Sequence, residues 1–395
     1  MINKKVLVIN SKAPYPLHTG GEMRTYQMIK LLSETFEEVD IVYLTNDENP
    51  ETKKGIDPYC KNSYAFQLSS KLFVLLRTLI GFLFGKLPLQ VYYFYSPKIQ
   101  KWIDANIEKY DLVFCNNIRT AEYVRNKSDV KKVIDYVDAI SMNYERAKNK
   151  SNGIWKFLYS IDYKRSLNYE LDILRKFNKT IIISEIDASY IISSSKEKNV
   201  SIAVISNMVE IPPFVKEDYE EEEKSVVFVG AMYYEANVAA VVYFAEKVFD
   251  KIKKVYPDLK FYIVGSRPHA KVQKLAKMQG VVVTGFIEDV SEYFTKPSIF
   301  VAPMQTGAGV QNKILQAMAA GCPVVTTTIG AEGIENITEK ELIVKDNPKE
   351  MAEAIVELLT NSEKRKQQAI CARKYILENL SHEHILNQFK QIVSF

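Results

Sequence analysis

Two series of short apolar runs, each alternating with helix-like segments, constrain the fold of this chain more than any other feature. The runs are rich in Val and Ile and almost continuously apolar, as expected of strands that are buried on both faces. In the first half they are KVLVIN (5–10), VDIVYL (39–44), DLVFCN (111–116), KVIDYV (132–137), TIIIS (180–184) and IAVIS (202–206). In the second half they are SVVFVG (225–230), KFYIVG (260–265), VVVTG (281–285), SIFVAP (298–303), PVVTTT (323–328) and ELIVK (341–345). Because helical segments such as 23–36 and 154–177 intervene, the sequence predicts an α/β protein with doubly wound parallel sheets.

An acidic segment divides the two series. Residues 212–224, PPFVKEDYEEEEK, begin with two prolines and continue into a run of acids that is solvated and cannot pack. We therefore predict an N-terminal Rossmann-like domain at 1–211 and a C-terminal one at 225–375, joined by this linker. A length of 395 residues also favours two domains over one.

The composition excludes several classes of protein. With 47% hydrophobic and 25% charged residues, the chain is ordinary globular material. A net charge of +4 is too small to indicate a nucleic-acid partner. The four cysteines, Cys60, Cys115, Cys322 and Cys371, show no CxxC spacing, so we expect neither a zinc site nor disulfides, and a cytoplasmic protein. A strand pattern begins at once in MINKKVLVIN, so no signal peptide is expected.

Residues 72–84, LFVLLRTLIGFLF, are the most apolar segment of the chain. The segment is too short to span a bilayer and contains Arg77. Two interpretations remain open: a buried helix of the first domain, or an apolar surface flanked by Lys71 and Lys86 that lies on the inner face of a membrane.

In open α/β sheets ligands bind at the carboxyl ends of the strands, so the residues after each strand are the candidate site. Gly20 and Gly21 follow the first strand and precede a helix, whose free N–H groups favour an anion. A plain turn explains the pair equally well, because it is not the GxGxxG dinucleotide fingerprint. His18 and Arg24 flank the pair. Each is expected to be either an exposed side chain or a ligand of the same anion.

Three strands of the second half are followed by further candidates. After the first of them, Gly230 is placed for a tight turn and Asn237 for a helix cap. Arg267 is the cation after the next strand. Phe286 follows the third, either as a platform for a flat ring or as a core aromatic.

The stretch TGAGVQNKILQAMAAGCPVVTT (306–327) has the strongest pattern. Gly307 and Gly309 allow close approach of the backbone to a ligand, and Lys313 falls in the first turn of the following helix. Glycines, a helix N-terminus and a lysine together hold a diphosphate by charge-assisted hydrogen bonds. Gln316 lies on the same helix face and can bind sugar hydroxyls. The residues expected to face the core are Ile314, Leu315 and Met318.

The second half resembles the nucleotide-sugar glycosyltransferases of the GT-B fold, in the retaining family-4 group known from bacterial surface-glycan synthesis. The matching pieces are FVGAMYYEAN (228–237), FYIVGSRP (261–268), VTGFIEDVSEYF (283–294), IFVAPMQTGAGVQNKILQAMAAGCPVVTT (299–327) and GAEGI (330–334). The first half resembles the family more loosely, in its glycine pair, in VIDYVDAIS (133–141) and in IIISEIDASYI (181–191). The resemblance implies two Rossmann-like domains facing a cleft, with a C-terminal helix at 376–395 that returns to the first domain.

The resemblance also implies roles for residues of this chain. Lys313 would be the catalytic cation that meets the donor diphosphate. The remaining donor-binding residues would be Gly20, Gly21, Arg24, Gly230, Arg267, Phe286, Ile287, Gly307, Gly309, Val310, Gln311, Asn312 and Gln316. Two glutamates are common in the family's glycine-rich segment, and Gly309 and Gln316 stand in their places here. An arginine common after the first strand of the second domain is missing from GAMYYEAN.

The function expected from these residues is transfer of a sugar, with retention, from a UDP- or GDP-sugar to a glycan, lipid-linked or protein acceptor. No DxD pair stands in a suitable loop, so neither a metal nor another cofactor is expected. Asp138 is a candidate for contact with the acceptor, and a helix cap is its alternative interpretation. Three other functions stay open: an inactive transferase-like subunit that binds a partner or glycan, a nucleotide-sugar epimerase, and a dehydrogenase.

Overall fold

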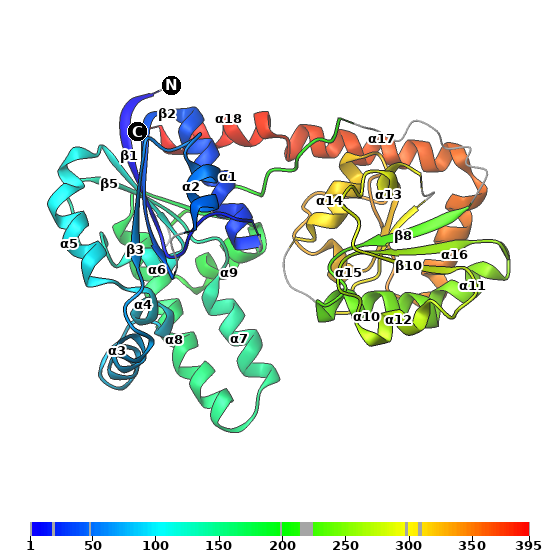
Figure 1. Cartoon of the computed structure of the whole chain (residues 1–395), viewed down its shortest axis with the longest axis horizontal. Coiled ribbons are helices and arrows are strands. Elements are labelled where there is room, and N and C mark those ends of the chain that lie inside the picture. The colour runs from blue at the N-terminus through cyan, green and yellow to red at the C-terminus, as the bar shows by residue number, and fades with distance from the viewer. Residues whose placement is uncertain are drawn as a thin grey trace. The chain divides into compact units, whose positions relative to one another are not determined.

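The computed structural model describes residues 2–17, 20–46, 49–197, 200–213, 224–296, 299–306 and 310–394. The chain divides into two compact units (Figure 1). The first comprises Met1–Asn207 together with Leu386–Phe395, and the second comprises Met208–Ile385. Most of the predicted acidic linker, residues 214–223, lies outside the described residues.

The first unit is built on a seven-stranded parallel sheet of order β3-β2-β1-β4-β5-β6-β7. Its strands are β1 (Ile2–Asn10), β2 (Phe36–Thr45), β3 (Asn62–Gln67), β4 (Leu112–Asn116), β5 (Lys131–Asp135), β6 (Lys179–Ile182) and β7 (Ala203–Val204). Its helices are α1 (Gly20–Thr35), α2 (Pro50–Ile56), α3 (Lys71–Phe84), α4 (Leu89–Phe94), α5 (Pro97–Asn106), η1 (Ile107–Lys109), α6 (Ile118–Ala121), α7 (Ile140–Lys150), α8 (Gly153–Lys176) and α9 (Glu185–Ser194).

The second unit is built on a six-stranded parallel sheet of order β10-β9-β8-β11-β12-β13. Its strands are β8 (Ser225–Val229), β9 (Lys260–Val264), β10 (Val281–Gly285), β11 (Ile299–Ala302), β12 (Val324–Thr326) and β13 (Ile343–Val344). Its helices are α10 (Glu235–Tyr243), η2 (Phe244–Phe249), α11 (Asp250–Lys253), α12 (Ala270–Leu275), α13 (Glu292–Thr295), α14 (Asn312–Ala319), α15 (Thr328–Ala331), α16 (Pro348–Thr360) and α17 (Ser362–Asn379).

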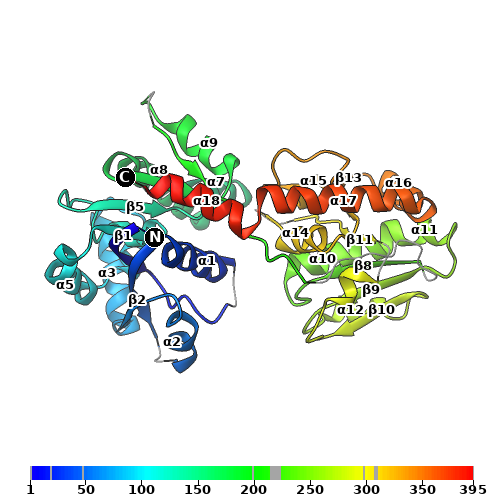
Figure 2. The same ribbon diagram turned by 90° about the horizontal axis from the view of Figure 1, so that it is seen from above.

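The sheets are covered on both faces, which explains why their strands read as continuous apolar runs. In the second unit Phe228 packs with α10 and α16 on one face, whereas its neighbour Val227 packs with α14 and α17 on the other. Figure 1 shows these two helical layers on either side of the strands. In the first unit α1 covers one face, and the last helix, α18 (His382–Val393), lies near it in both views (Figure 2). Phe389 of α18 has its ring 6.3 Å from that of Phe114 in β4.

These observations confirm the predicted fold class of two doubly wound parallel-sheet domains, and every predicted strand is present. The strand β3 was missed, because an edge strand such as NSYAFQ is half polar and gives no apolar run. The expectation that Asn237 caps a helix is wrong, since α10 begins at Glu235 with Tyr234 at its N-cap. The interpretation of residues 72–84 as a buried helix is also wrong. The segment is helical, but most of its large apolar side chains are exposed.

Candidate functional site

Each sheet has a point where the strand order reverses, and such switch points are where α/β folds bind ligands. In the second unit β8 and β11 are neighbours, and their helices α10 and α14 leave toward opposite faces. The carboxyl ends of β8 and β11 therefore lie between the starts of these two helices. In the first unit the same relationship holds between β1 and β4.

Lys313 bridges the switch point of the second unit. It lies in the first turn of α14, as predicted, and its Nζ donates to Oδ1 of Asn237 in α10 at 2.8 Å. Nζ also donates to Oε1 of Gln311 at 3.0 Å and lies 5.3 Å from the ring centroid of Phe228. Within the described part of the chain its partners are neutral, and no carboxylate pairs with it.

Burial sets the electrostatics of this lysine. Removal from water lowers the pKa of Lys313 from 10.5 to about 8, because the charged form loses hydration that neutral acceptors replace only in part. A half-buried cation without a countercharge favours the arrival of an anion. A diphosphate supplies that charge, and the free N–H groups at the start of α14 add further donors.

The helix that carries Lys313 is oriented by its apolar face. Ile314, Leu315 and Met318 are buried, which confirms that they face the core. Gln311 occupies the N-cap position, and its carbonyl accepts from the N–H of Ile314 at 2.9 Å. Asn312 and Val310 are half-buried beside it. Gly307 and Gly309, the two glycines predicted to approach the ligand, lie outside the described residues, as does His18.

Two glycines bring the backbone after β8 against the backbone after β9. A Cβ on Gly265 would lie 1.7 Å from the carbonyl oxygen of Gly230, and Gly265 has φ +152°, so only glycine fits there. A Cβ on Gly230 would lie 2.8 Å from Nδ2 of Asn237. Gly230 therefore leaves space for the amide that holds Lys313.

Three further predicted residues follow β9 and β10 at the same edge of the sheet. Arg267 has φ +50° and its guanidinium lies 5.7 Å from the ring centroid of Tyr233. Phe286 is 73% exposed, so its interpretation as a core aromatic is wrong and its ring is open to a ligand. Ile287 beside it is half-buried.

A cavity of about 500 Å³ lies beside Gln316 in the second unit. Gln316 is exposed one helical turn after Lys313, and Asp289 and Ser291 contribute polar groups to the same cavity. Asp289 already accepts from the N–H and Oγ of Ser291, at 2.9 and 2.5 Å. The volume suits a nucleoside-sized ligand. Its lining is Glu210, Ile211, Pro212, Pro213, Asp289, Val290, Ser291, Phe294, Gln316 and Ala320.

Arg24 of the first unit does not have the exposed side chain expected for a ligand-binding residue. It is completely buried, and its Nε donates to Oδ2 of Asp135 at 2.8 Å. Asn207 accepts from the same guanidinium at 3.3 Å. The prediction is wrong because α1 turns this position toward the end of β5, where a carboxylate receives it. Gly20 and Gly21 form the first two residues of α1 rather than a loop before it, and nothing lies within 4 Å of a Cβ on Gly20.

Asp138 is half-buried just after β5, and Nδ2 of Asn143 donates to its carboxylate at 2.6 Å. Burial, followed by the nearby charge of Asp187, raises the pKa of Asp138 to about 6. The helix-cap interpretation is wrong, because Ala139 occupies the N-cap of α7. The preceding Val137 has φ +68°, a strained conformation for a β-branched residue, and such strain concentrates at functional sites.

The structure reveals two partners that sequence reasoning missed. Asn237 was interpreted as a cap, although it is the acceptor for Lys313, 76 residues away. Arg119 of the first unit is half-buried, donates to Oε1 of Gln90 at 2.7 Å and carries a positive charge near Asp138. Asn237 lies in the motif FVGAMYYEAN (228–237), which could have indicated it, whereas no local signal indicated Arg119.

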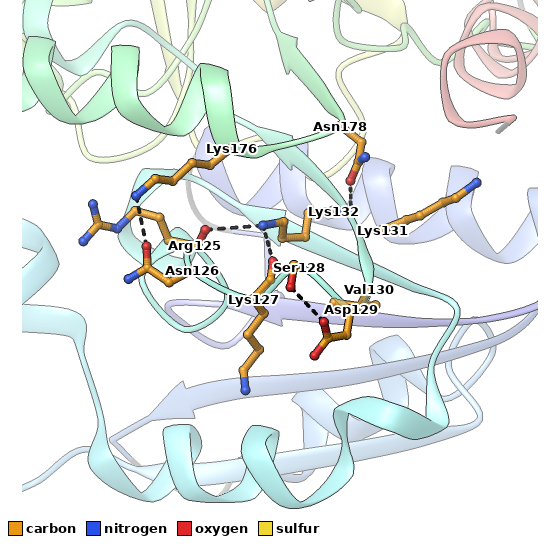
Figure 3. Close-up of a pocket in the computed structure, with 10 residues that line it drawn as sticks. All are labelled: Arg125, Asn126, Lys127, Ser128, Asp129, Val130, Lys131, Lys132, Lys176 and Asn178. Atoms are coloured by element: carbon orange, nitrogen blue, oxygen red, sulfur yellow. Dashed lines mark hydrogen bonds between the residues drawn. The ribbon is translucent and has the colours of Figure 1, made fainter.

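A second cavity, of about 470 Å³, lies in the first unit beside the amino end of β5 (Figure 3). Its lining is Arg125, Asn126, Lys127, Ser128, Asp129, Val130, Lys131, Lys132, Lys176 and Asn178. Its cations are engaged: Lys127 pairs with Asp104 at 2.7 Å, and Arg125 pairs with Asp172 at 2.6 Å. Lys132 donates to the carbonyl of Lys127 at 2.5 Å. The cavity is rich in cations, as an anion-binding site would be. Because these cations already have partners, they are not placed to bind an anion.

The described residues contain no group of three or more His, Cys, Asp or Glu side chains arranged to hold a metal ion. None of the helices in the described ranges is long and apolar enough to cross a membrane.

Comparisons with known proteins agree with this geometry. Residues 223–361 match the family model "Glycosyl transferases group 1". An uncharacterised 44.6 kDa protein in the cps region of Klebsiella pneumoniae is 27% identical, over 98% of this chain and 99% of that protein. HepE from Anabaena, solved in complex with UDP, superimposes with a TM-score of 0.68 at 14% identity, over 98% of each chain. TarM from S. aureus, solved with fondaparinux, α-GlcNAc-glycerol and UDP, superimposes with a TM-score of 0.66 at 15% identity, over 98% of this chain and 99% of that one.

Proposed function

We propose that this chain, a GT-B nucleotide-sugar glycosyltransferase whose second unit carries a glycosyl transferases group 1 domain, moves a sugar from a UDP-linked donor to a glycan acceptor. The choice of UDP is supported by the structures of HepE and TarM, which contain UDP. HepE has also been solved with UDP-glucose. The glycan acceptor is supported by the ligands of TarM, which include fondaparinux and α-GlcNAc-glycerol.

The position of Lys313 carries the proposal. Its ammonium group lies at the switch point between β8 and β11, held by Asn237 and Gln311 and without a carboxylate among the described residues. Both acceptors are neutral, so a bound diphosphate would provide the first full countercharge. The cost of burying the cation in the free protein would then be offset when the donor binds.

The chemistry that follows is stabilisation of the leaving group. As the bond to the anomeric carbon breaks, negative charge grows on the departing diphosphate, and a positioned cation lowers the energy of that state. Lys313 and the N–H groups at the start of α14 would provide this stabilisation. We propose that transfer proceeds with retention and without a metal ion, the leaving phosphate accepting the proton of the acceptor hydroxyl.

Gln316 and Phe286 would bind the nucleoside part of the donor. Gln316 offers an amide donor and acceptor beside a cavity of suitable volume. Phe286 offers an exposed ring for stacking. Asp138, with Arg119 near it, would meet the acceptor at the carboxyl edge of the first sheet.

Calorimetric titration of UDP, GDP, ADP, CMP and dTDP into the wild-type protein and into Lys313→Ala tests the proposal. We expect micromolar binding of UDP to the wild type and a loss of about 10- to 150-fold in Lys313→Ala, because a hydrogen bond to a charged group contributes about 1.5–3 kcal/mol. Lys349→Ala is the matched control, because Lys349 has a 77% exposed side chain in the same unit. It should bind UDP as the wild type does.

Two results would contradict the proposal. Equal UDP affinity in Lys313→Ala and the wild type would remove Lys313 from the site. Failure of all five nucleotides to bind would instead favour a transferase-like subunit without a donor site. Incubation with UDP-glucose alone separates an epimerase, which would convert the sugar in the absence of an acceptor.

A further inference from the structure

Helix α3 of the first unit presents an apolar face to solvent. Eight of its large apolar side chains are each between 50% and 84% exposed: Leu72, Phe73, Leu75, Leu76, Leu79, Ile80, Leu83 and Phe84. A helix on the surface of a soluble protein normally turns such residues toward the core. Scattered exposed leucines are common, but a contiguous patch of this kind marks an interaction site.

The inner side of α3 carries Arg77 and Gly81 together with the buried Val74. Arg77 turns toward the protein, where its Nε and Nη2 donate to the carbonyls of Tyr92 and Tyr93 at 2.8 and 2.9 Å. A Cβ on Gly81 would lie 2.5 Å from the ring of Tyr92, so this glycine lets the helix rest on the ring. The contacts of α3 thus hold its polar and small residues inward and its leucines outward.

The start of α8 adds a second apolar group at the same end of the unit. Ile154, Trp155 and Phe157 are 65%, 61% and 59% exposed. The two helices are joined through Arg165 of α8, whose Nη2 donates to the carbonyl of Phe82 in α3 at 2.8 Å. Figure 1 shows α3 and the α7–α8 hairpin extending from the same end of the first unit.

The charged residues of α3 and of the first turn of α8 are all positive. The sequence has no Asp or Glu between Asp57 and Asp104. Exposed lysines stand at both ends of α3, Lys71 and Lys86, and Lys156 lies between the exposed Trp155 and Phe157. An apolar face bordered by cations matches the interface of a bilayer that contains anionic lipids.

We propose that α3 and the first turn of α8 form a surface, the α3/α8 surface, that docks the protein on an anionic bilayer. With 14 residues α3 is roughly 21 Å long, too short to cross the hydrocarbon core, so it would lie in the interface. Trp155 is the residue type that prefers this depth. A second copy of the chain fits less well, because self-pairing of the surface would bring its lysines together. The inference is independent of the donor nucleotide, and it places the acceptor of the proposed transferase at a lipid surface.

Vesicle co-sedimentation of the full chain tests the inference directly. We expect binding to vesicles of 70% phosphatidylcholine and 30% phosphatidylglycerol, and at least about tenfold weaker binding to phosphatidylcholine alone, since roughly 1 kcal/mol is gained per nearby lysine. The double variant Leu79→Glu/Ile80→Glu should lose at least about tenfold in affinity for the anionic vesicles. Ile370→Glu, which replaces an equally exposed apolar residue of α17 in the second unit, should bind as the wild type does.

The fluorescence of Trp155 reports whether the surface itself enters the lipid. The chain has two tryptophans, so the variant Trp102→Phe leaves Trp155 as the only reporter. Its emission should shift to shorter wavelength with anionic vesicles and be quenched by brominated acyl chains. Unchanged circular dichroism and unchanged UDP binding in Leu79→Glu/Ile80→Glu would show that the variant is folded.

Three outcomes would overturn the inference. These are no binding to either vesicle composition, vesicle binding that survives Leu79→Glu/Ile80→Glu, and a dimer in sedimentation equilibrium that this variant dissociates. The last would make the surface an interface between copies of the chain. Because UDP binding is measured separately, failure of this inference would leave the proposed function standing.

Discussion

The Nζ of Lys313 lies 2.8 Å from Oδ1 of Asn237, a residue 76 positions earlier in the chain. This hydrogen bond joins the helix after β8 to the helix after β11, the two strands at which the order of the sheet reverses. It fixes a half-buried ammonium group at the edge where ligands of α/β folds bind. The neutral amide holds the lysine without cancelling its charge.

Asn237→Asp tests whether that neutrality matters. A carboxylate at this position would neutralise Lys313 and repel a diphosphate, so UDP affinity should fall by at least about tenfold. Asn237→Ala removes the acceptor without adding charge and should weaken UDP binding less. Calorimetry on both variants measures the difference. Equal losses in the two would indicate that the amide acts only by positioning the lysine.

The pH dependence of UDP binding follows from the lowered pKa of Lys313. Burial lowers that pKa from 10.5 to about 8, so the charged lysine destabilises the free protein fully below pH 8, and this cost is lost progressively as the pH rises from 8 to 10.5. A diphosphate requires the charged form. UDP affinity should therefore be constant between about pH 7 and 8, where the terminal phosphate is ionised, and fall by about tenfold per pH unit above pH 8.

Lys313→Arg provides the control for this titration. A guanidinium stays charged across the range, so whatever its affinity, its UDP binding should not change between pH 7.5 and pH 9.5. A wild-type affinity that is also constant over that interval would show that the lysine is charged throughout, or that it does not meet the diphosphate.

Removal of one partner from the ion pair of Arg24 and Asp135 should strongly destabilise the first unit. Both side chains are fully buried, so Arg24→Ala leaves a carboxylate in the interior without a countercharge. We expect a loss of about 3–5 kcal/mol in the free energy of unfolding. Urea denaturation followed by tryptophan fluorescence reports on this unit, because Trp102 and Trp155 both belong to it.

The exposed pair of Arg175 and Glu197, which belongs to the same unit, is the reference for that measurement, with both side chains 50% exposed. Arg175→Ala should cost less than about 1 kcal/mol. If Arg24→Ala destabilised the protein no more than Arg175→Ala does, the buried pair would not be structural, and a ligand-facing role for Arg24 would return.

Gly265→Ala should disrupt the second unit. The new Cβ would lie 1.7 Å from the carbonyl oxygen of Gly230, and backbone atoms cannot move aside as a flexible side chain can. We expect a loss of about 3 kcal/mol or more, measured by thermal unfolding with circular dichroism. Gly20→Ala, where nothing lies within 4 Å of the added atom, should leave stability unchanged or slightly raised.

Gly20→Ala also tests the predicted role of the glycine pair in donor binding. If the backbone at Gly20 approaches the diphosphate, the added methyl group should weaken binding of UDP-glucose although the protein remains stable. Unaltered binding would show that Gly20 serves only as the start of α1.

The sequence by itself determined the local elements and their order. Continuous apolar runs predicted every strand of both sheets except β3. A strand that is buried on both faces is apolar along its whole length, so it can be identified without knowing which strands pair with it. The amphipathic spacing in α14 predicted which of its residues face the core, and the motif placed Lys313 in its first turn. The order of strands and helices was sufficient to predict two doubly wound domains.

Only the tertiary structure decided how distant residues meet. The sequence indicated that Arg24 follows a strand, but the fold joined it to Asp135, 111 residues away, and buried it. It likewise selected Asn237 as the acceptor for Lys313. The sequence showed that α3 is apolar, but it did not show which way its apolar residues face. That direction depends on the contacts of Arg77 and Gly81 with Tyr92. Sequence periodicity shows which residues share one face of a helix or strand. Their burial, ion pairing and pKa depend on which other elements pack against that face.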